Sequence, residues 1–146
     1  MRAVIFDLDH TLFAAENALH DGVEELLSIL QRLGIAVGGL SAKDHRVLVR
    51  LEEAGIRHHF DSVLCADQTY EPKEAAGVHH MLYLLGAKPE ETILVSHAHS
   101  DILLGKDAGL RTTIGISHGL DNTAPLAEAG ADHIVANVPA VLDVLE

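Results

Sequence analysis

Two carboxylates and a hydroxyl group follow directly after the first apolar stretch of the chain. Residues 3–6 are all apolar, and Asp7, Asp9 and Thr11 come within the next five positions. A short apolar run bounded by polar residues is typical of a strand that is buried on both faces. Desolvating two acids at the end of such a strand costs free energy that a metal, a cation or a ligand must offset. Asp7, Asp9 and Thr11 are therefore the first candidates for a functional site.

Acids two positions apart can divide the work of a reaction between them. One can attack an electrophile while the other donates and accepts protons. When the electrophile is phosphorus, an attacking aspartate forms an aspartyl phosphate, and the transfer depends mainly on neutralising and positioning charge. Ser41 and Lys73, which lie further along the chain, have the right character to hold phosphoryl oxygens.

Apolar segments alternate with helical patterns along the rest of the chain. Five helical patterns end in a glycine followed by an apolar residue, which is typical of a left-handed helix C-terminus. These glycines are Gly34, Gly55, Gly86, Gly109 and Gly130. Strands are predicted after them, over residues 35–40, 62–65, 92–95, 112–116 and 133–135. Asp21 is expected to cap the first helix, with Glu24 completing a capping box.

This alternation predicts an α/β fold of three layers, with a doubly wound parallel sheet between helices. In such folds ligands bind beyond the carboxyl ends of the strands. Ser41 follows the second predicted strand, Lys73 ends the loop after the third, and His97 and Asp101 follow the fourth. We therefore expect these side chains to converge with Asp7 at one edge of the sheet.

Composition limits the classes of protein that the chain can belong to. Its 146 residues are 48% apolar, which is typical of one globular domain, here predicted over residues 1–146. A net charge of −12 argues against broad nucleic-acid binding, although a small phosphorylated substrate is still compatible with it. One cysteine excludes an internal disulfide, so we expect a cytoplasmic location. No signal peptide or membrane span is expected, because no long uninterrupted apolar stretch occurs.

The segment Asp7-Leu8-Asp9-His10-Thr11 resembles the DxDxT motif of the haloacid dehalogenase-like (HAD) superfamily of phosphatases. Ser41, Lys73 and the segment 96–101 resemble its three later motifs, in the same order along the chain. The sequence from Gly115 onward is similar to the phosphoglycolate-phosphatase-like branch. The resemblance implies a strand order of 5-4-1-2-3 with Asp7 on the central strand. It also implies that no cap domain is present, because neither of the usual insertion points has room for one.

The resemblance also implies roles for individual residues. Asp7 would be the nucleophile, and Asp9 the acid that protonates the leaving group and then the base that activates water. Thr11, Ser41 and Lys73 would bind the substrate. Metal ligands would come from Asp7, the backbone carbonyl of Asp9, His97 and Asp101, and Asp101 could instead support Lys73. The predicted protein is thus a phosphomonoester hydrolase that depends on a divalent metal, Mg²⁺ by resemblance.

The implied partner is a phosphorylated substrate, small or macromolecular, because a site without a cap is open. A second copy of the chain could cover that site. His97 stands where the family has an acid that binds Mg²⁺, and three interpretations remain open. His97 binds a softer ion such as Mn²⁺; or Asp101 moves in and Mg²⁺ binds weakly. The third is that catalysis is impaired and the fold serves binding or assembly.

Overall fold

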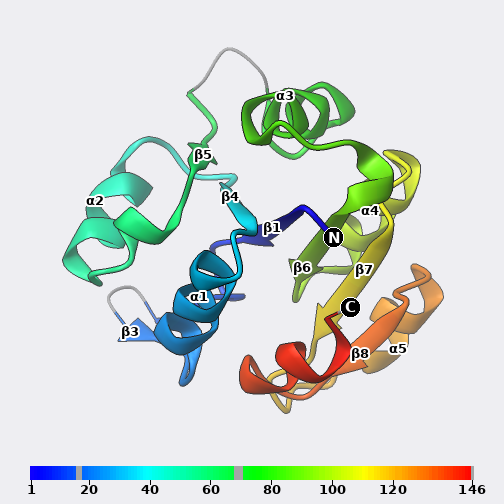
Figure 1. Ribbon diagram of the computed structural model, residues 1–146. Coiled ribbons are helices and arrows are strands. Elements are labelled where there is room, and N and C mark those ends of the chain that lie inside the picture. The colour runs from blue at the N-terminus through cyan, green and yellow to red at the C-terminus, as the bar shows by residue number, and fades with distance from the viewer. Residues whose placement is uncertain (16–17, 68–70, 146) are drawn as a thin grey trace.

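A parallel sheet forms the centre of the molecule, seen in a computed structural model that describes residues 1–15, 18–67 and 71–145 (Figure 1). Within those residues the sheet has six strands. Their spatial order is β5 (Ser62–Leu64), β4 (Ala36–Leu40), β1 (Ala3–Asp7), β6 (Thr92–Ser96), β7 (Thr112–Ile116) and β8 (His133–Val135). All neighbouring strands in it are parallel. When only the strands of this sheet are counted along the chain, β7-β6-β1-β4-β5 is the predicted order 5-4-1-2-3, which is therefore confirmed. The short strand β8 lies at the edge beyond β7.

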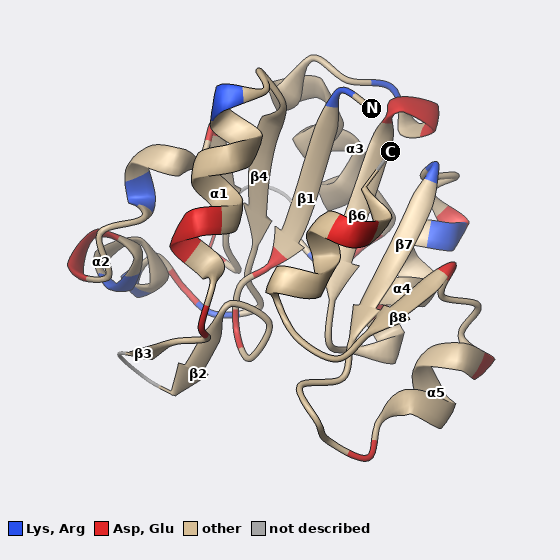
Figure 2. Cartoon of the chain, turned by 60° about the horizontal axis from the view of Figure 1, so that its bottom comes forward, with Lys and Arg blue, Asp and Glu red and all other residues tan. Residues whose placement is uncertain are grey.

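Helices cover both faces of this sheet, which makes the three predicted layers (Figure 2). They are α1 (Val23–Arg32), α2 (Arg46–Glu53), α3 (Ala75–Leu85), α4 (His99–Asp107) and α5 (Thr123–Glu128). Short 3₁₀ helices span η1 (Arg57–His59), η2 (Pro89–Glu91) and η3 (Pro139–Val144). Phe6 of β1 packs in one core with α1, α2 and η3, whereas its neighbour Ile5 packs with α3 on the opposite face. Alternating side-chain directions along a buried strand produce these two cores.

The helices end at the predicted glycines, but the cap predicted for the N-terminus of α1 is absent. The five predicted glycines all have a positive φ, between 64° and 91°. The prediction that Asp21 caps α1 is wrong, because the N-cap is Gly22 with φ 87° and no side chain bonds to the helix end. A side chain at Gly22 would collide with Pro139, so packing against η3 determines how the chain enters α1.

A hairpin of β2 (Phe13–Ala15) and β3 (Ala18–Leu19) follows β1, and the sequence did not predict it. It lies on the same side of the molecule as α2 (Figure 1). None of the helices in the described residues is long and apolar enough to cross a membrane. The absence of a cap domain and the extent of one domain over 1–146 stay predictions.

Gly77, in the first turn of α3, allows the loop that carries Lys73 to pack closely against the helix. A Cβ there would lie 2.7 Å from Pro72 Cα and would also collide with the backbone carbonyl of Glu71. Backbone cannot move away as a flexible side chain can, so we expect Gly77→Ala to lower the free energy of unfolding by about 1–3 kcal/mol. Urea unfolding measures this, with Ala76→Ser, at an exposed site one residue earlier, as the control. Equal stability of the two variants would contradict the close packing.

Candidate active site

Asp7 lies at the carboxyl end of the central strand, and side chains from three parts of the chain surround its carboxylate. It is only 4% exposed. Lys73 Nζ donates a hydrogen bond of 2.8 Å to its Oδ1, and Thr11 Oγ1 donates one of 2.7 Å to its Oδ2. His97 Nδ1 lies 3.0 Å from the same Oδ2. The fold therefore brings together Asp7, Thr11, Lys73 and His97, as expected for residues at the carboxyl ends of parallel strands.

The charges of Asp7 and Lys73 stabilise each other. Burial by itself would raise the pKa of Asp7, but the hydrogen bond from His97 and the charge of Lys73 outweigh it and lower that pKa. Burial would likewise lower the pKa of Lys73, yet the nearby Asp7 and Asp101 carboxylates raise it. Both side chains are consequently ionised at neutral pH, the state in which a carboxylate can act as a nucleophile.

Asp101, in the first turn of α4, fixes Lys73 from the other side. Its Oδ2 accepts hydrogen bonds of 2.6 Å from Lys73 Nζ and 2.8 Å from Ser96 Oγ. The Ser96 hydroxyl in turn accepts a bond of 3.0 Å from the backbone N–H of Ala98. Ser96 was not predicted as a site residue, although it begins the segment 96–101 that resembles the last family motif. Asp101 thus contacts the lysine, one of the two roles that the family resemblance implied for it.

The carboxylate of Asp9 has a different set of partners. Its Oδ2 accepts a hydrogen bond of 2.8 Å from Ser41 Oγ. Its Oδ1 lies 3.1 Å from Arg50 Nη1 and 3.7 Å from Lys43 Nζ. Ser41 therefore contacts the carboxylate of Asp9. Neither Arg50 nor Lys43 was predicted as a site residue from the sequence.

The contacts of these side chains determine whether they suit a magnesium ion. Asp101 is bonded to Lys73 and Ser96, and the carboxylate of Asp9 is bonded to Ser41 and Arg50. Within the described residues, no three His, Cys, Asp or Glu side chains form a group that could hold a metal. Mg²⁺ prefers six oxygens in a tight octahedral arrangement. As they are bonded here, the described side chains of Asp7, Asp9, His97 and Asp101 do not form such a group. The backbone carbonyl of Asp9, which the resemblance gives as a ligand, is not part of that set, and no reaction step below depends on a metal.

Two further histidines, His20 and His118, support the loop that carries Thr11. The rings of His20 and His118 stack with centroids 3.6 Å apart. His118 Nε2 lies 3.1 Å from the backbone oxygen of Thr11, and His20 Nε2 lies 3.1 Å from that of His10. His10 and His118 both have a positive φ, 65° and 53°. Such backbone is unusual outside glycine, so the loop is held by tertiary contacts rather than by local preference.

The stacked pair predicts how stability depends on pH. Burial, and then the charge of His20, lower the pKa of His118 to about 4. The unfolded chain, with an ordinary histidine pKa of about 6.5, binds a proton in the range where the folded chain does not. The free energy of unfolding should therefore fall as pH decreases from about 6.5 to about 4. Urea unfolding of His118→Asn, in which asparagine tolerates the positive φ, should show a shallower fall.

The exposed His79 provides the matched control for this experiment, as His79→Gln. That variant should keep the pH dependence of the original chain, because it leaves the stacked pair intact. Equal slopes for His118→Asn and the original chain would show that His118 does not cause the dependence.

A sequence profile of the haloacid dehalogenase-like hydrolases matches residues 14–114. The chain therefore belongs to the haloacid dehalogenase-like hydrolase family. The matched residues include Ser41, Lys73, His97 and Asp101, and they begin after Thr11.

Several known proteins are similar to this chain. Pyrophosphatase PpaX of Oceanobacillus iheyensis is 29% identical over 125 residues, which are 84% of this chain and 58% of that protein. Phosphoglycolate phosphatase of Chromobacterium violaceum is 27% identical over 140 residues, 94% of this chain and 59% of that protein. The crystal structure of a HAD phosphatase from Thermococcus onnurineus matches with a TM-score of 0.86 at 15% identity, covering 99% of this chain and 97% of that one.

These relatives confirm the resemblance to the phosphoglycolate-phosphatase-like branch. The chain spans less than two thirds of the length of the two curated relatives. The similarity to the solved structure shows the fold.

Proposed function

We propose that the chain hydrolyses phosphomonoesters through a phosphoaspartyl intermediate on Asp7. One observation carries the proposal: a buried, ionised aspartate at the end of the central strand has a lysine ammonium 2.8 Å from its carboxylate. A carboxylate beside a fixed cation can attack phosphorus while the cation neutralises the charge of the phosphoryl oxygens. The phosphatase names of the relatives also support it.

In the first step, an Asp7 carboxylate oxygen forms a bond to phosphorus and the bond from phosphorus to the leaving oxygen breaks. The leaving oxygen keeps the electron pair and takes a proton from the carboxyl group of Asp9. Lys73, held by Asp101 at 2.6 Å, stays beside the phosphoryl oxygens. Thr11 and Ser41 are the neighbouring hydroxyl donors for substrate oxygens.

In the second step, water attacks the phosphorus of the aspartyl phosphate. The carboxylate of Asp9 takes a proton from this water, the bond between phosphorus and the Asp7 oxygen breaks, and inorganic phosphate leaves. Asp7 and Asp9 return to their starting states, so the same acid serves both steps.

The nature of the metal belongs to the proposal as well. HAD phosphatases typically use a divalent metal, and by resemblance the ion would be Mg²⁺, or Mn²⁺ because of the nitrogen of His97. The side-chain contacts described above do not support a magnesium site. Metal dependence therefore stays a prediction, together with the cytoplasmic location, the absence of broad nucleic-acid binding and a second copy covering the site.

The position of His97 also favours a second candidate function. Its imidazole directly contacts the carboxylate that would have to attack phosphorus. A site tied in this way could be catalytically impaired, and the chain would then act in binding or assembly. Release of phosphate from p-nitrophenyl phosphate, with and without divalent cations, separates the two functions, because only the hydrolase releases it.

A further inference from the structure

We propose that the exposed face of α3 is a docking surface for a second copy of this chain. The two α3 helices would pack antiparallel to each other around a twofold axis. The inference concerns how copies of the chain associate, so it does not depend on the proposed function.

Helix α3 carries no charge on either its buried or its exposed side. Its 11 residues include no Lys, Arg, Asp or Glu. The side that packs on the sheet consists of Gly77, Val78, Met81, Leu82 and Leu85. The opposite side is exposed and consists of Ala75, Ala76, His79, Tyr83 and Leu84, with His80 half-buried beside them. Helices without a charged face are typically covered on all sides, so this exposed side is expected to have a partner.

Tyr83 and Leu84 are the large side chains of this exposed face. Tyr83 is 81% exposed and Leu84 is 43% exposed. The His80 ring lies nearly parallel to the Tyr83 ring, with an angle of 14° between the planes and 6.5 Å between the centroids. Tyrosine offers a large, rigid contact area with a polar tip and is enriched at protein interfaces. Tyr83 is therefore the residue that we expect to anchor the contact.

The distribution of charge favours a second copy of the chain as the occupant. The chain has a net charge of −12, so two copies repel each other over most of their surface. Each of the other four α-helices in the described residues carries at least one charged side chain (Figure 2). Two such acidic copies meet with the least repulsion at an uncharged helix. A basic partner would instead require acidic residues on this face, and α3 has none.

The spacing of large and small residues along α3 fits an antiparallel pair. Ala76 and Tyr83 are seven positions apart, so they lie on the same line along the helix, about two turns from each other. A twofold axis midway between them passes between His79 and His80. It places Tyr83 of one copy opposite Ala76 of the other, so the large side chain fills the space that the small one leaves. A parallel pair would set tyrosine against tyrosine and leave a gap at the alanines.

The size of the face limits how tightly the two copies can bind. A helix of 11 residues is about 16 Å long. Its exposed side is therefore smaller than the roughly 800 Å² per partner of a standard interface. We expect reversible association with a Kd in the micromolar range, on the order of 10–100 µM.

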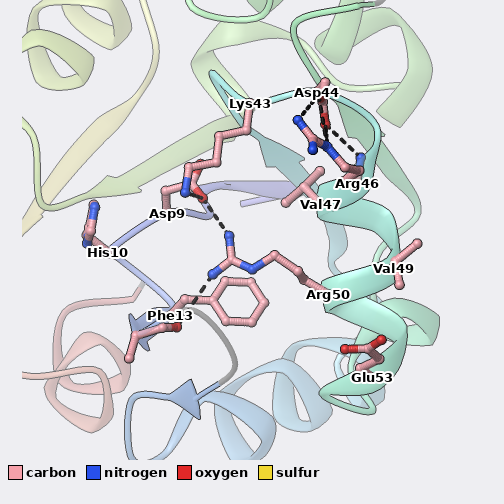
Figure 3. Close-up of a pocket in the computed structure, with 11 residues that line it drawn as sticks. Asp9, His10, Phe13, Lys43, Asp44, Arg46, Val47, Val49, Arg50 and Glu53 are labelled. Atoms are coloured by element: carbon pink, nitrogen blue, oxygen red, sulfur yellow. Dashed lines mark hydrogen bonds and ion pairs between the residues drawn. The ribbon is translucent and has the colours of Figure 1, made fainter.

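Sedimentation velocity over a range of protein concentrations tests the proposal. The original chain should sediment as a dimer at the highest concentrations and as a monomer at the lowest. Tyr83→Glu should weaken the association by about tenfold or more, because it removes the anchor and leaves an unpaired charge in the contact. The matched control is Val49→Glu, at another apolar position within a helix, 53% exposed, which Figure 3 shows on α2 pointing away from Asp9. It should associate like the original chain.

A pair of introduced charges tests the antiparallel arrangement. Ala76→Lys alone should weaken the association as Tyr83→Glu does. Combining the two substitutions should restore it, because each introduced carboxylate then faces an introduced ammonium group of the other copy. Circular dichroism checks that every variant folds. An original chain that is monomeric at all concentrations, or a dimer that Tyr83→Glu leaves intact, would overturn the proposal. Failure of the double variant to associate would overturn the antiparallel pairing.

Discussion

Asp7→Asn is expected to reduce phosphate release from p-nitrophenyl phosphate by about a thousandfold or more. An amide oxygen lacks the negative charge with which the carboxylate attacks phosphorus, so the covalent intermediate cannot form. The side chain keeps its shape, and Lys73 keeps its 2.6 Å contact with Asp101, so the variant should still fold. Initial rates under saturating substrate measure the effect, and circular dichroism checks the fold.

The control for this prediction is Asp121→Asn, which removes one carboxylate from an exposed position in the loop after β7. It should retain the full rate. Acid quenching during turnover, followed by intact mass measurement, should show a phosphorylated species in the original chain but not in Asp7→Asn. A rate for Asp7→Asn within tenfold of the original would mean that Asp7 is not the nucleophile.

The parts of the fold that the sequence predicted depend on local patterns. Buried strands show as apolar runs, and helix ends show as glycines that need a positive φ, so both can be read without knowing the packing. The N-terminus of α1 could not be read in this way. Its cap is decided by Pro139, which is more than a hundred positions away in the chain and meets Gly22 only in the folded state.

Some residues of the candidate site could be predicted from local patterns, and others depend on packing that the sequence does not show. Asp7, Lys73 and Asp101 follow predicted strands, and parallel strands bring their carboxyl ends to one edge, so their convergence could be expected. Arg50 lies in the middle of a helix and looks, in the sequence, like the exposed Arg46. Only the burial of Val47 and Leu51 turns the neighbouring Arg50 toward Asp9. Such packing decides which face of a helix points at a site. The sequence carries no separate signal for it.

His97→Asp is expected to raise Mg²⁺-dependent phosphate release by about tenfold or more. The substitution restores a carboxylate at the position where the family motif has one, beside the Oδ2 of Asp7. A second carboxylate supplies the hard oxygen and the negative charge that Mg²⁺ requires and that imidazole does not offer. Phosphate release measured with Mg²⁺, Mn²⁺, Zn²⁺ or a chelator compares the variant with the original chain.

Thermal unfolding gives a second readout that needs no turnover. Without metal, two carboxylates near each other in a buried site repel, so His97→Asp should be less stable than the original by about 1–3 kcal/mol. Added Mg²⁺ should recover that loss, because a ligand that binds only the folded state stabilises it. The control is His97→Asn, which also lacks the imidazole but adds no charge, and Mg²⁺ should leave its melting temperature unchanged.

The two readouts together decide what His97 does in the original chain. If His97→Asp gains stability and activity with Mg²⁺ while the original chain has neither, the histidine has disabled the site, and binding or assembly becomes the better function. If the original chain releases phosphate in the presence of a chelator and His97→Asp then loses that activity, the hydrogen bond of His97 and the charge of Lys73 support the reaction without a metal. Lack of any Mg²⁺ effect on His97→Asp would show that position 97 does not control metal binding, and the contact with Asp7 would need another explanation.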